Sequence, residues 1–267
     1  MYMSASIGPG ELAIVDYLPL KKGDVVSIVG SGGKTTLMYH LARELTMRRM
    51  RVITTTTTKI LPPHPSQSPR LIVTSNEQIL LKEAKDLLAR ESPVTLAGEY
   101  RGEKLKGLSP VFIDTLQKQE IADVILVEAD GAKQCPLKAP NQTEPVIPSS
   151  TTWTLAVVGL DGIGKPNTEE YVFRPHYFAH LTGIKIGEVV TPEALARIIL
   201  HPEGLVRGNP LTAKTGVILN KGDVAGGISI GAEVAMFLRK KNCHAVAIIL
   251  ITCLLPTPKV MMAFPSE

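Results

Sequence analysis

Short apolar runs alternate along the chain with longer segments in which apolar residues recur at helical spacing. This alternation is typical of a mostly parallel β-sheet flanked by helices, so the pattern predicts an α/β fold. The runs that predict strands are Asp24–Gly30, Arg51–Thr58, Arg70–Thr74, Val94–Gly98, Asp123–Asp130, Trp153–Asp161, Gly216–Asn220 and Ala245–Thr252.

Helical spacing marks four segments among these runs. In the first of them, Leu37, Leu41 and Leu45 recur every fourth residue and form an apolar stripe. In the second, Asn76 is placed to cap the N-terminus. The predicted helices are Lys34–Arg49, Asn76–Arg90, Pro192–His201 and Gly231–Lys241.

Two long stretches, Gly131–Thr152 and Gly162–His176, break this rhythm. Loops of that length inside a compact α/β domain are usually functional or mobile. Because the chain has no repeat, low-complexity tract or clear linker, we expect one domain over residues 1–267, with an irregular tail from about residue 254.

Composition and charge narrow the class of protein. Aromatic residues make up only 4% of the chain, the net charge is +4, and no dense Lys/Arg stripe carries aromatic residues between its charges, which disfavours nucleic-acid binding. The three cysteines form no CxxC pair, which indicates a reducing, cytoplasmic setting. The N-terminus lacks a signal-peptide pattern, and the apolar run Ala245–Leu255 is too short to cross a bilayer, so we expect no membrane association.

A glycine-rich segment joins the first predicted strand to the first predicted helix. Glycines let backbone N–H groups close around phosphate oxygens, and the helix N-terminus adds a partial positive charge. In such a loop the lysine reaches the β- and γ-phosphates, and the hydroxyl after it ligates Mg²⁺. We therefore expect a P-loop NTPase-like fold that binds ATP or GTP with Mg²⁺. The expected phosphate-binding residues are Gly30, Ser31, Gly32, Gly33, Lys34, Thr35 and Thr36.

The spacing of this loop is unusual. It is two residues shorter than GxxxxGK[ST], because Ile28 stands six residues before Lys34. GSGGKTT instead resembles the GxxGK[ST]T loop of Mur ligases and folylpolyglutamate synthases. Thr35 breaks the dinucleotide fingerprint GxGxxG, which disfavours NAD.

An apolar strand later in the chain ends in two carboxylates, Glu128 and Asp130. Two residues apart on a strand, they share a face. A hydrophobic strand that delivers acids beside a P-loop places them on the Mg²⁺ ion or on the attacking water. We expect Glu128 and Asp130 to act with Lys34 in catalysis and, with Thr35, to hold the metal. The alternative is two solvated acids at a strand end.

Several sequence blocks together resemble the YqeC family. They are GSGGKTT, TTTTK, EADGAKQCPLKAP, EPVIP, VVGLDGIGKP and HPEGL, and they run from the P-loop to about Asn220. The resemblance implies an accessory protein of selenium-dependent molybdenum hydroxylases, acting in maturation or insertion of their cofactor. The family often has a His before its Arg-Pro pair, where this chain has Phe173. The positions that the resemblance marks are Lys34, Thr35, Lys59, Glu128, Asp130, Lys133, Lys138, Glu144, Asp161, Lys165 and Arg174.

Three cations follow the acidic strand, in the long polar loops. Lys133 and Lys138 on a Gly/Pro-containing loop would receive an anionic second substrate, such as a pterin phosphate or nucleotide phosphate, or would be two solvated lysines. Arg174 would clamp a phosphate, or would pair with Glu169 or Glu170.

The sequence does not decide between adenine and guanine as the base of the nucleotide. Asn220-Lys221-Gly222-Asp223 matches the NKxD pattern of GTPases, in which a carboxylate accepts both guanine N–H groups, whereas the Mur-like loop favours ATP.

Three functions compete at this point. The first is an NTP-hydrolysing accessory protein whose partner is a molybdenum hydroxylase or its pterin cofactor. The second is a Mur-like ligase or kinase acting on a small anion, although 267 residues leave no room for the extra domains of a complete Mur ligase. The third is a non-catalytic, nucleotide-gated binding module.

Overall fold

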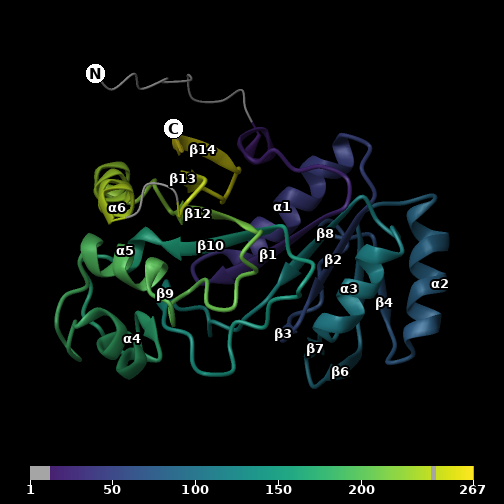
Figure 1. Cartoon of the computed structure of the whole chain (residues 1–267), viewed down its shortest axis with the longest axis horizontal. Coiled ribbons are helices and arrows are strands. Elements are labelled where there is room, and N and C mark those ends of the chain that lie inside the picture. The colour runs from purple at the N-terminus through teal and green to yellow at the C-terminus, as the bar shows by residue number, and fades with distance from the viewer. Residues whose placement is uncertain (1–12, 242–244, 267) are drawn as a thin grey trace.

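A large, mostly parallel β-sheet dominates the computed structural model, which describes residues 13–241 and 245–266 (Figure 1). In the described residues this sheet has nine strands: β1 (Asp24–Gly30), β2 (Val52–Thr56), β4 (Arg70–Val73), β5 (Val94–Ala97), β8 (Val124–Glu128), β10 (Trp153–Gly159), β12 (Lys214–Asn220), β13 (Ile248–Cys253) and β14 (Lys259–Pro265). Their order across the sheet is β14-β13-β12-β10-β1-β8-β2-β5-β4, and among these nine described strands only the pair β13–β14 is antiparallel. The predicted α/β class is confirmed.

Helices cover both faces of the sheet, because apolar side chains project from both faces of its central strands. On β1, Val26 and Ile28 pack in one apolar cluster with helix α1 (Lys34–Met47) and the short helix η1 (Ile14–Tyr17). Val25 and Val29 point to the opposite face. There α2 (Glu77–Leu88) and α3 (Pro110–Lys118) cover one end of the sheet, and α4 (Pro175–Thr182), α5 (Pro192–Leu200) and α6 (Gly227–Lys241) gather at the other (Figure 1).

Two small sheets stand apart from the main one. β3 (Lys59–Ile60), β7 (Lys104–Lys106) and β6 (Glu99–Arg101) form an antiparallel three-stranded sheet. β9 (Leu137–Lys138) pairs in parallel with β11 (Val172–Phe173). This pairing joins the two long polar stretches of the sequence to each other. Along the chain, β9 comes before β10 and the short helix η2 (Leu160–Gly162), and β11 comes after them.

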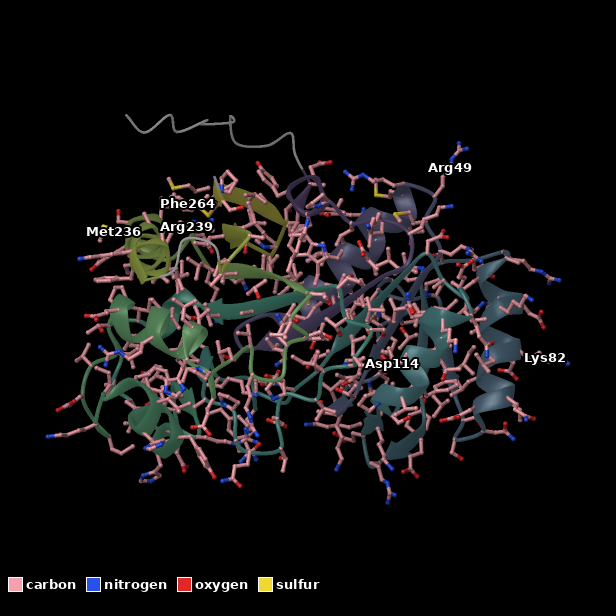
Figure 2. All side chains as sticks on the ribbon, in the orientation of Figure 1. Arg49, Lys82, Asp114, Met236, Arg239 and Phe264 are labelled. Carbon is pink, nitrogen blue, oxygen red and sulfur yellow. The ribbon has the colours of Figure 1, made fainter. Side chains whose placement is uncertain are left out.

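The C-terminal tail corrects an expectation. We expected an irregular segment from about residue 254, but β14 adds an antiparallel strand to the edge of the sheet. The Arg239 side chain of α6 fixes this strand, because its Nη2 donates to the Phe264 carbonyl at 2.7 Å. Figure 2 shows these two residues side by side.

No helix within residues 13–241 and 245–266 is both long enough and apolar enough to cross a membrane.

Candidate functional site

The glycine-rich loop passes directly from β1 into α1, tightly against neighbouring strands. Gly30 has φ 96°, and a Cβ there would lie 2.1 Å from the Val157 carbonyl oxygen. Gly33 has φ 137°, and a Cβ there would lie 2.5 Å from Nδ2 of Asn220. Only glycine fits these two positions. As Gly33 is also the N-cap, no side chain of the described residues caps α1, and its first amides are available to an anion.

The loop opens into a cleft of about 1370 Å³. Lys34 and Thr35 form its floor, and the carboxyl ends of β2, β8 and β12 run toward it, as expected for a ligand crevice in an open α/β sheet. Typical small-molecule pockets measure roughly 300–1,000 Å³. The cleft therefore exceeds the space that one ligand usually fills.

Lys34 folds back over its own loop. Its Nζ donates to the Gly30 carbonyl at 2.9 Å, and lies 3.3 Å from Asp130 Oδ1 and 3.8 Å from Glu128 Oε1. Burial alone would lower the pKa of Lys34, but the two carboxylates outweigh it and raise that pKa. Lys34 is thus held charged at the floor of the cleft.

Thr35 and Glu128 form a close pair beside this lysine. The Thr35 hydroxyl donates to Glu128 Oε2 at 2.5 Å. The pair forms because β1 and β8 are parallel neighbours, with Ile28 opposite Glu128. Burial raises the pKa of Glu128, and the nearby positive charge of Lys34 offsets only part of this rise.

These oxygens suit Mg²⁺, which is held by one or two carboxylates plus substrate phosphates rather than by an all-protein cage. Among the described residues, no group of three or more His, Cys, Asp or Glu side chains could hold a metal ion. Thr35 and Glu128 would therefore hold Mg²⁺ together with a bound triphosphate.

Asp130 occupies a different position from Glu128. Both acids reach Lys34, but Asp130 is fully buried and is not among the residues that line the cleft. Its Oδ2 accepts from the Gly30 amide at 2.9 Å and from Lys138 Nζ at 2.8 Å, while its Oδ1 faces Lys34 Nζ at 3.3 Å. We expected Asp130 to be a metal ligand, but this geometry better suits a residue that holds the glycine-rich loop in place.

Lys138 is also placed differently from the expectation. We expected an accessible point charge or a solvated lysine, but its side chain is 0% exposed on β9. Its Nζ donates to Asp130, to the Gly131 carbonyl at 2.6 Å and to Glu144 Oε2 at 3.3 Å. The pairing of β9 with β11 encloses it, so it is not accessible to a second substrate.

Arg174 continues this network from the second long loop. Its Nη1 donates to Glu144 Oε2 at 2.8 Å, so its partner is neither Glu169 nor Glu170. Its guanidinium also lies 4.4 Å from the ring centroid of Phe173. Burial would raise the pKa of Glu144, but Lys138 and Arg174 together lower it.

Two further lysines marked by the sequence lie on the walls of the cleft. Lys59 stands on β3 and Lys133 on the loop after β8. The Lys133 ammonium lies 5.3 Å from the Phe173 ring centroid, within cation–π range. Lys165, by contrast, lies over Tyr171 and is not among the lining residues.

The NKGD segment forms the far end of the same cleft. Asn220 Nδ2 donates to the Gly32 carbonyl at 2.7 Å, and Asn220 Oδ1 accepts from the Leu254 amide at 3.1 Å. Asn220 thereby ties the phosphate loop to the end of β13. Lys221 pairs with Asp161 at 2.6 Å, and Asp223 lines the cleft.

Sequence reasoning missed part of the lining. Glu99, Lys104 and Lys106 reach the cleft from the three-stranded sheet, and Cys253 and Leu254 reach it from the end of β13. The alternation Lys-Leu-Lys at 104–106 was the available signal for a short strand with one charged face.

Comparison with known proteins now identifies the class. The family described as "YqeC protein" matches residues 26–176 of this chain. The chain is 34% identical over 211 residues to the "Uncharacterized protein YqeC" of Escherichia coli (strain K12), covering 78% of this chain and 79% of that protein. This chain belongs to the YqeC family.

A solved structure is also similar in part. It is the crystal structure of FtsY from Mycoplasma mycoides, at 13% identity and a TM-score of 0.38. The match covers 90% of this chain and 64% of that one, so this chain spans less than two thirds of its length.

Proposed function

We propose that this chain binds a purine nucleoside triphosphate with Mg²⁺ and hydrolyses it. The observation that carries the proposal is the Thr35–Glu128 pair beside the uncapped start of α1. The amides of α1 and Lys34 would bind the phosphates. When bound, Mg²⁺ would neutralise charge on the β- and γ-phosphates.

The residues of the chain supply the remaining steps. Lys34 exchanges its carboxylate partners for phosphate oxygens, a change between ionic partners that keeps it charged. Glu128 orients the water that attacks the terminal phosphate, or accepts the proton of that water, as the nucleoside diphosphate leaves.

Titration calorimetry with Mg²⁺-ATP and Mg²⁺-GTP tests the binding step. The Lys34→Ala variant should lose measurable affinity for the preferred nucleotide. Lys82→Ala is the control, because Lys82 points outward from α2 (Figure 2). Equal affinities in wild type and Lys34→Ala would refute the proposal.

We further propose that the nucleotide cycle serves maturation or insertion of the pterin cofactor of selenium-dependent molybdenum hydroxylases. Membership of the YqeC family supports this role. The test is a host that makes such a hydroxylase and carries Lys34→Ala in place of the wild-type protein. The hydroxylase should then accumulate without its cofactor; normal cofactor content would contradict the role.

A second candidate is a kinase or ligase that transfers phosphate to a small anion. The size of the cleft favours it, because the space extends beyond the phosphate loop to the three-stranded sheet. Product analysis separates the candidates: a kinase yields a phosphorylated acceptor, a ligase yields a coupled acceptor with inorganic phosphate, and a hydrolase yields only the nucleoside diphosphate and inorganic phosphate.

A further inference from the structure

The three-stranded sheet has one strongly cationic face. Lys59 on β3 lies directly opposite Lys106 on β7, and Arg101 on β6 lies directly opposite Lys104. Lys104 and Lys106 are two residues apart on one strand, so all four cations project from the same face. Leu105 between them is fully buried on the other face, within the main core.

The charge on this face is poorly balanced. Glu99, opposite Lys106, is its one carboxylate among the strand residues, and it already pairs with Arg101 at 2.9 Å and Lys106 at 3.0 Å. Lys59 and Lys104 have no carboxylate within ion-pair distance in the described part of the chain. Like charges directly opposite each other destabilise a sheet, and a bound anion would relieve this repulsion.

The cationic face has a fixed position beside the nucleotide site. The Gly107 amide donates to the Thr58 carbonyl at 2.9 Å, and a Cβ on Gly107 would lie 1.8 Å from the Thr56 carbonyl oxygen. The end of β7 is therefore pressed against the end of β2. In turn, the Thr57 amide donates to the Glu128 carbonyl at 3.2 Å, which connects this segment to the end of β8.

The same lysines line the cleft that contains the phosphate loop. Lys59, Lys104 and Lys106 are all among its lining residues, and the whole cleft of about 1370 Å³ exceeds a typical single-ligand pocket of roughly 300–1,000 Å³. A cluster of lysines on one wall of a cleft of this volume suits the phosphate group of a small molecule.

We propose that this face, with Lys59 and Lys104 as its main contacts, is the binding site of a second, phosphorylated small molecule that lies beside the nucleotide. The inference deepens the proposed function and rests on it for the occupant of the other part of the cleft. Lysine ammonium groups bind phosphate as point charges, so the site recognises the phosphate group of its ligand.

The test uses inorganic pyrophosphate as probe and the full chain saturated with Mg²⁺ and a non-hydrolysable triphosphate. Titration calorimetry should show pyrophosphate binding to the wild type. The Lys59→Gln/Lys104→Gln variant should bind pyrophosphate at least about tenfold more weakly, the loss of one charge-assisted contact or more. The control is Lys82→Gln/Lys85→Gln on α2, which removes the same charge from exposed positions outside the cleft.

Each outcome has a separate meaning. A loss of pyrophosphate affinity that exceeds any loss of nucleotide affinity, and is absent from the control, supports the site. Equal losses for both ligands, no change, or no pyrophosphate binding to the loaded wild type would overturn it. Failure of the wild type to bind any nucleotide would instead contradict the proposed function, and the two failures are thus distinguishable.

Discussion

Lys138 Nζ lies 2.8 Å from Asp130 Oδ2, and both side chains are at most 1% exposed. Asp130 also accepts from the Gly30 amide and faces Lys34, so one carboxylate connects the start of the phosphate loop to two lysines. If Lys34 turned to a bound phosphate, as we propose, Lys138 would remain as the counter-ion of Asp130. Lys34 could then bind the nucleotide without leaving Asp130 as an unpaired buried charge.

Replacement of Lys138 by Met should therefore destabilise the protein and weaken nucleotide binding. Loss of one partner from a buried ion pair costs roughly 3–5 kcal/mol in free energy of unfolding. Because Asp130 would keep its contact with Lys34, we expect a loss near the lower end of that range, about 3 kcal/mol. Urea unfolding measures the stability change. Lys34 should also be held more strongly on Asp130, so the nucleotide Kd should rise.

The double variant Lys138→Met/Asp130→Asn is the decisive comparison. It removes both charges, so it should recover most of the lost stability, whereas two independent effects would add. Lys133→Met, on the loop before β9, is the control, and as an exposed substitution it should change the free energy of unfolding by about 0.5 kcal/mol or less. Additive losses in the double variant would show that Lys138 and Asp130 do not act as a pair.

Glu128→Gln should abolish hydrolysis and leave nucleotide binding measurable. Glu128 lines the cleft and contacts Thr35, so in the proposed reaction its charge would act on metal and water mainly in the transition state. A phosphate-release assay and a binding titration separate the two effects. Wild-type turnover by Glu128→Gln would favour the non-catalytic binding module.

We also expect Asp130→Asn to abolish hydrolysis, and the buried position of Asp130 suggests by which route. It would act through the loop that it holds, so its loss should raise the nucleotide Kd as well as lower turnover. A turnover defect with an unchanged Kd would instead place Asp130 with Glu128 in the chemistry.

The phosphate loop and its neighbours were predictable because their signals are local. Gly30 ends an apolar strand and Lys34 begins a helix with a four-residue repeat, and both elements formed where expected. Glu128 follows from the apolar strand before it, because the ends of parallel strands meet at one edge of the sheet.

The burial of Lys138 was not predictable from local pattern. A lysine in a Gly/Pro-containing segment has the features of a solvated residue, and its enclosure depends on the pairing of Leu137–Lys138 with Val172–Phe173, far along the chain. Strand β14 was missed for a similar reason: it has no regular alternation, and pairing with β13 determines its conformation.

His40 should make stability depend on pH. Its Nε2 lies 2.9 Å from the Leu254 carbonyl and donates to it, and burial lowers its pKa below 6.5. As the pH falls through 6.5, the unfolded chain binds a proton that the folded chain does not, so the free energy of unfolding decreases.

The matched variant is His40→Gln, which keeps a side-chain donor but does not titrate. Urea unfolding at about pH 7.5 and about pH 5.5 should show a larger loss of stability on acidification for the wild type than for His40→Gln. Equal losses would mean that His40 titrates alike in the folded and unfolded chains.

The base preference can be tested at Asp223, which lines the cleft beyond the phosphate loop. If the NKGD segment reads guanine, Asp223→Asn replaces one carboxylate acceptor by a donor that faces a guanine N–H. An unpaired buried donor costs roughly 1–3 kcal/mol, so GTP affinity should fall by about one to two decades. Binding of xanthosine triphosphate should rise, because its ring offers a carbonyl where guanine has an amino group, and ATP affinity should not change.

Asn220→Ala is a useful second variant. Asn220 connects Gly32 to Leu254, so its loss should weaken the binding of ATP and GTP alike. Calorimetric titration of all three nucleotides checks both variants, and unchanged GTP and ATP affinities in Asp223→Asn would make Asp223 part of a turn and favour ATP.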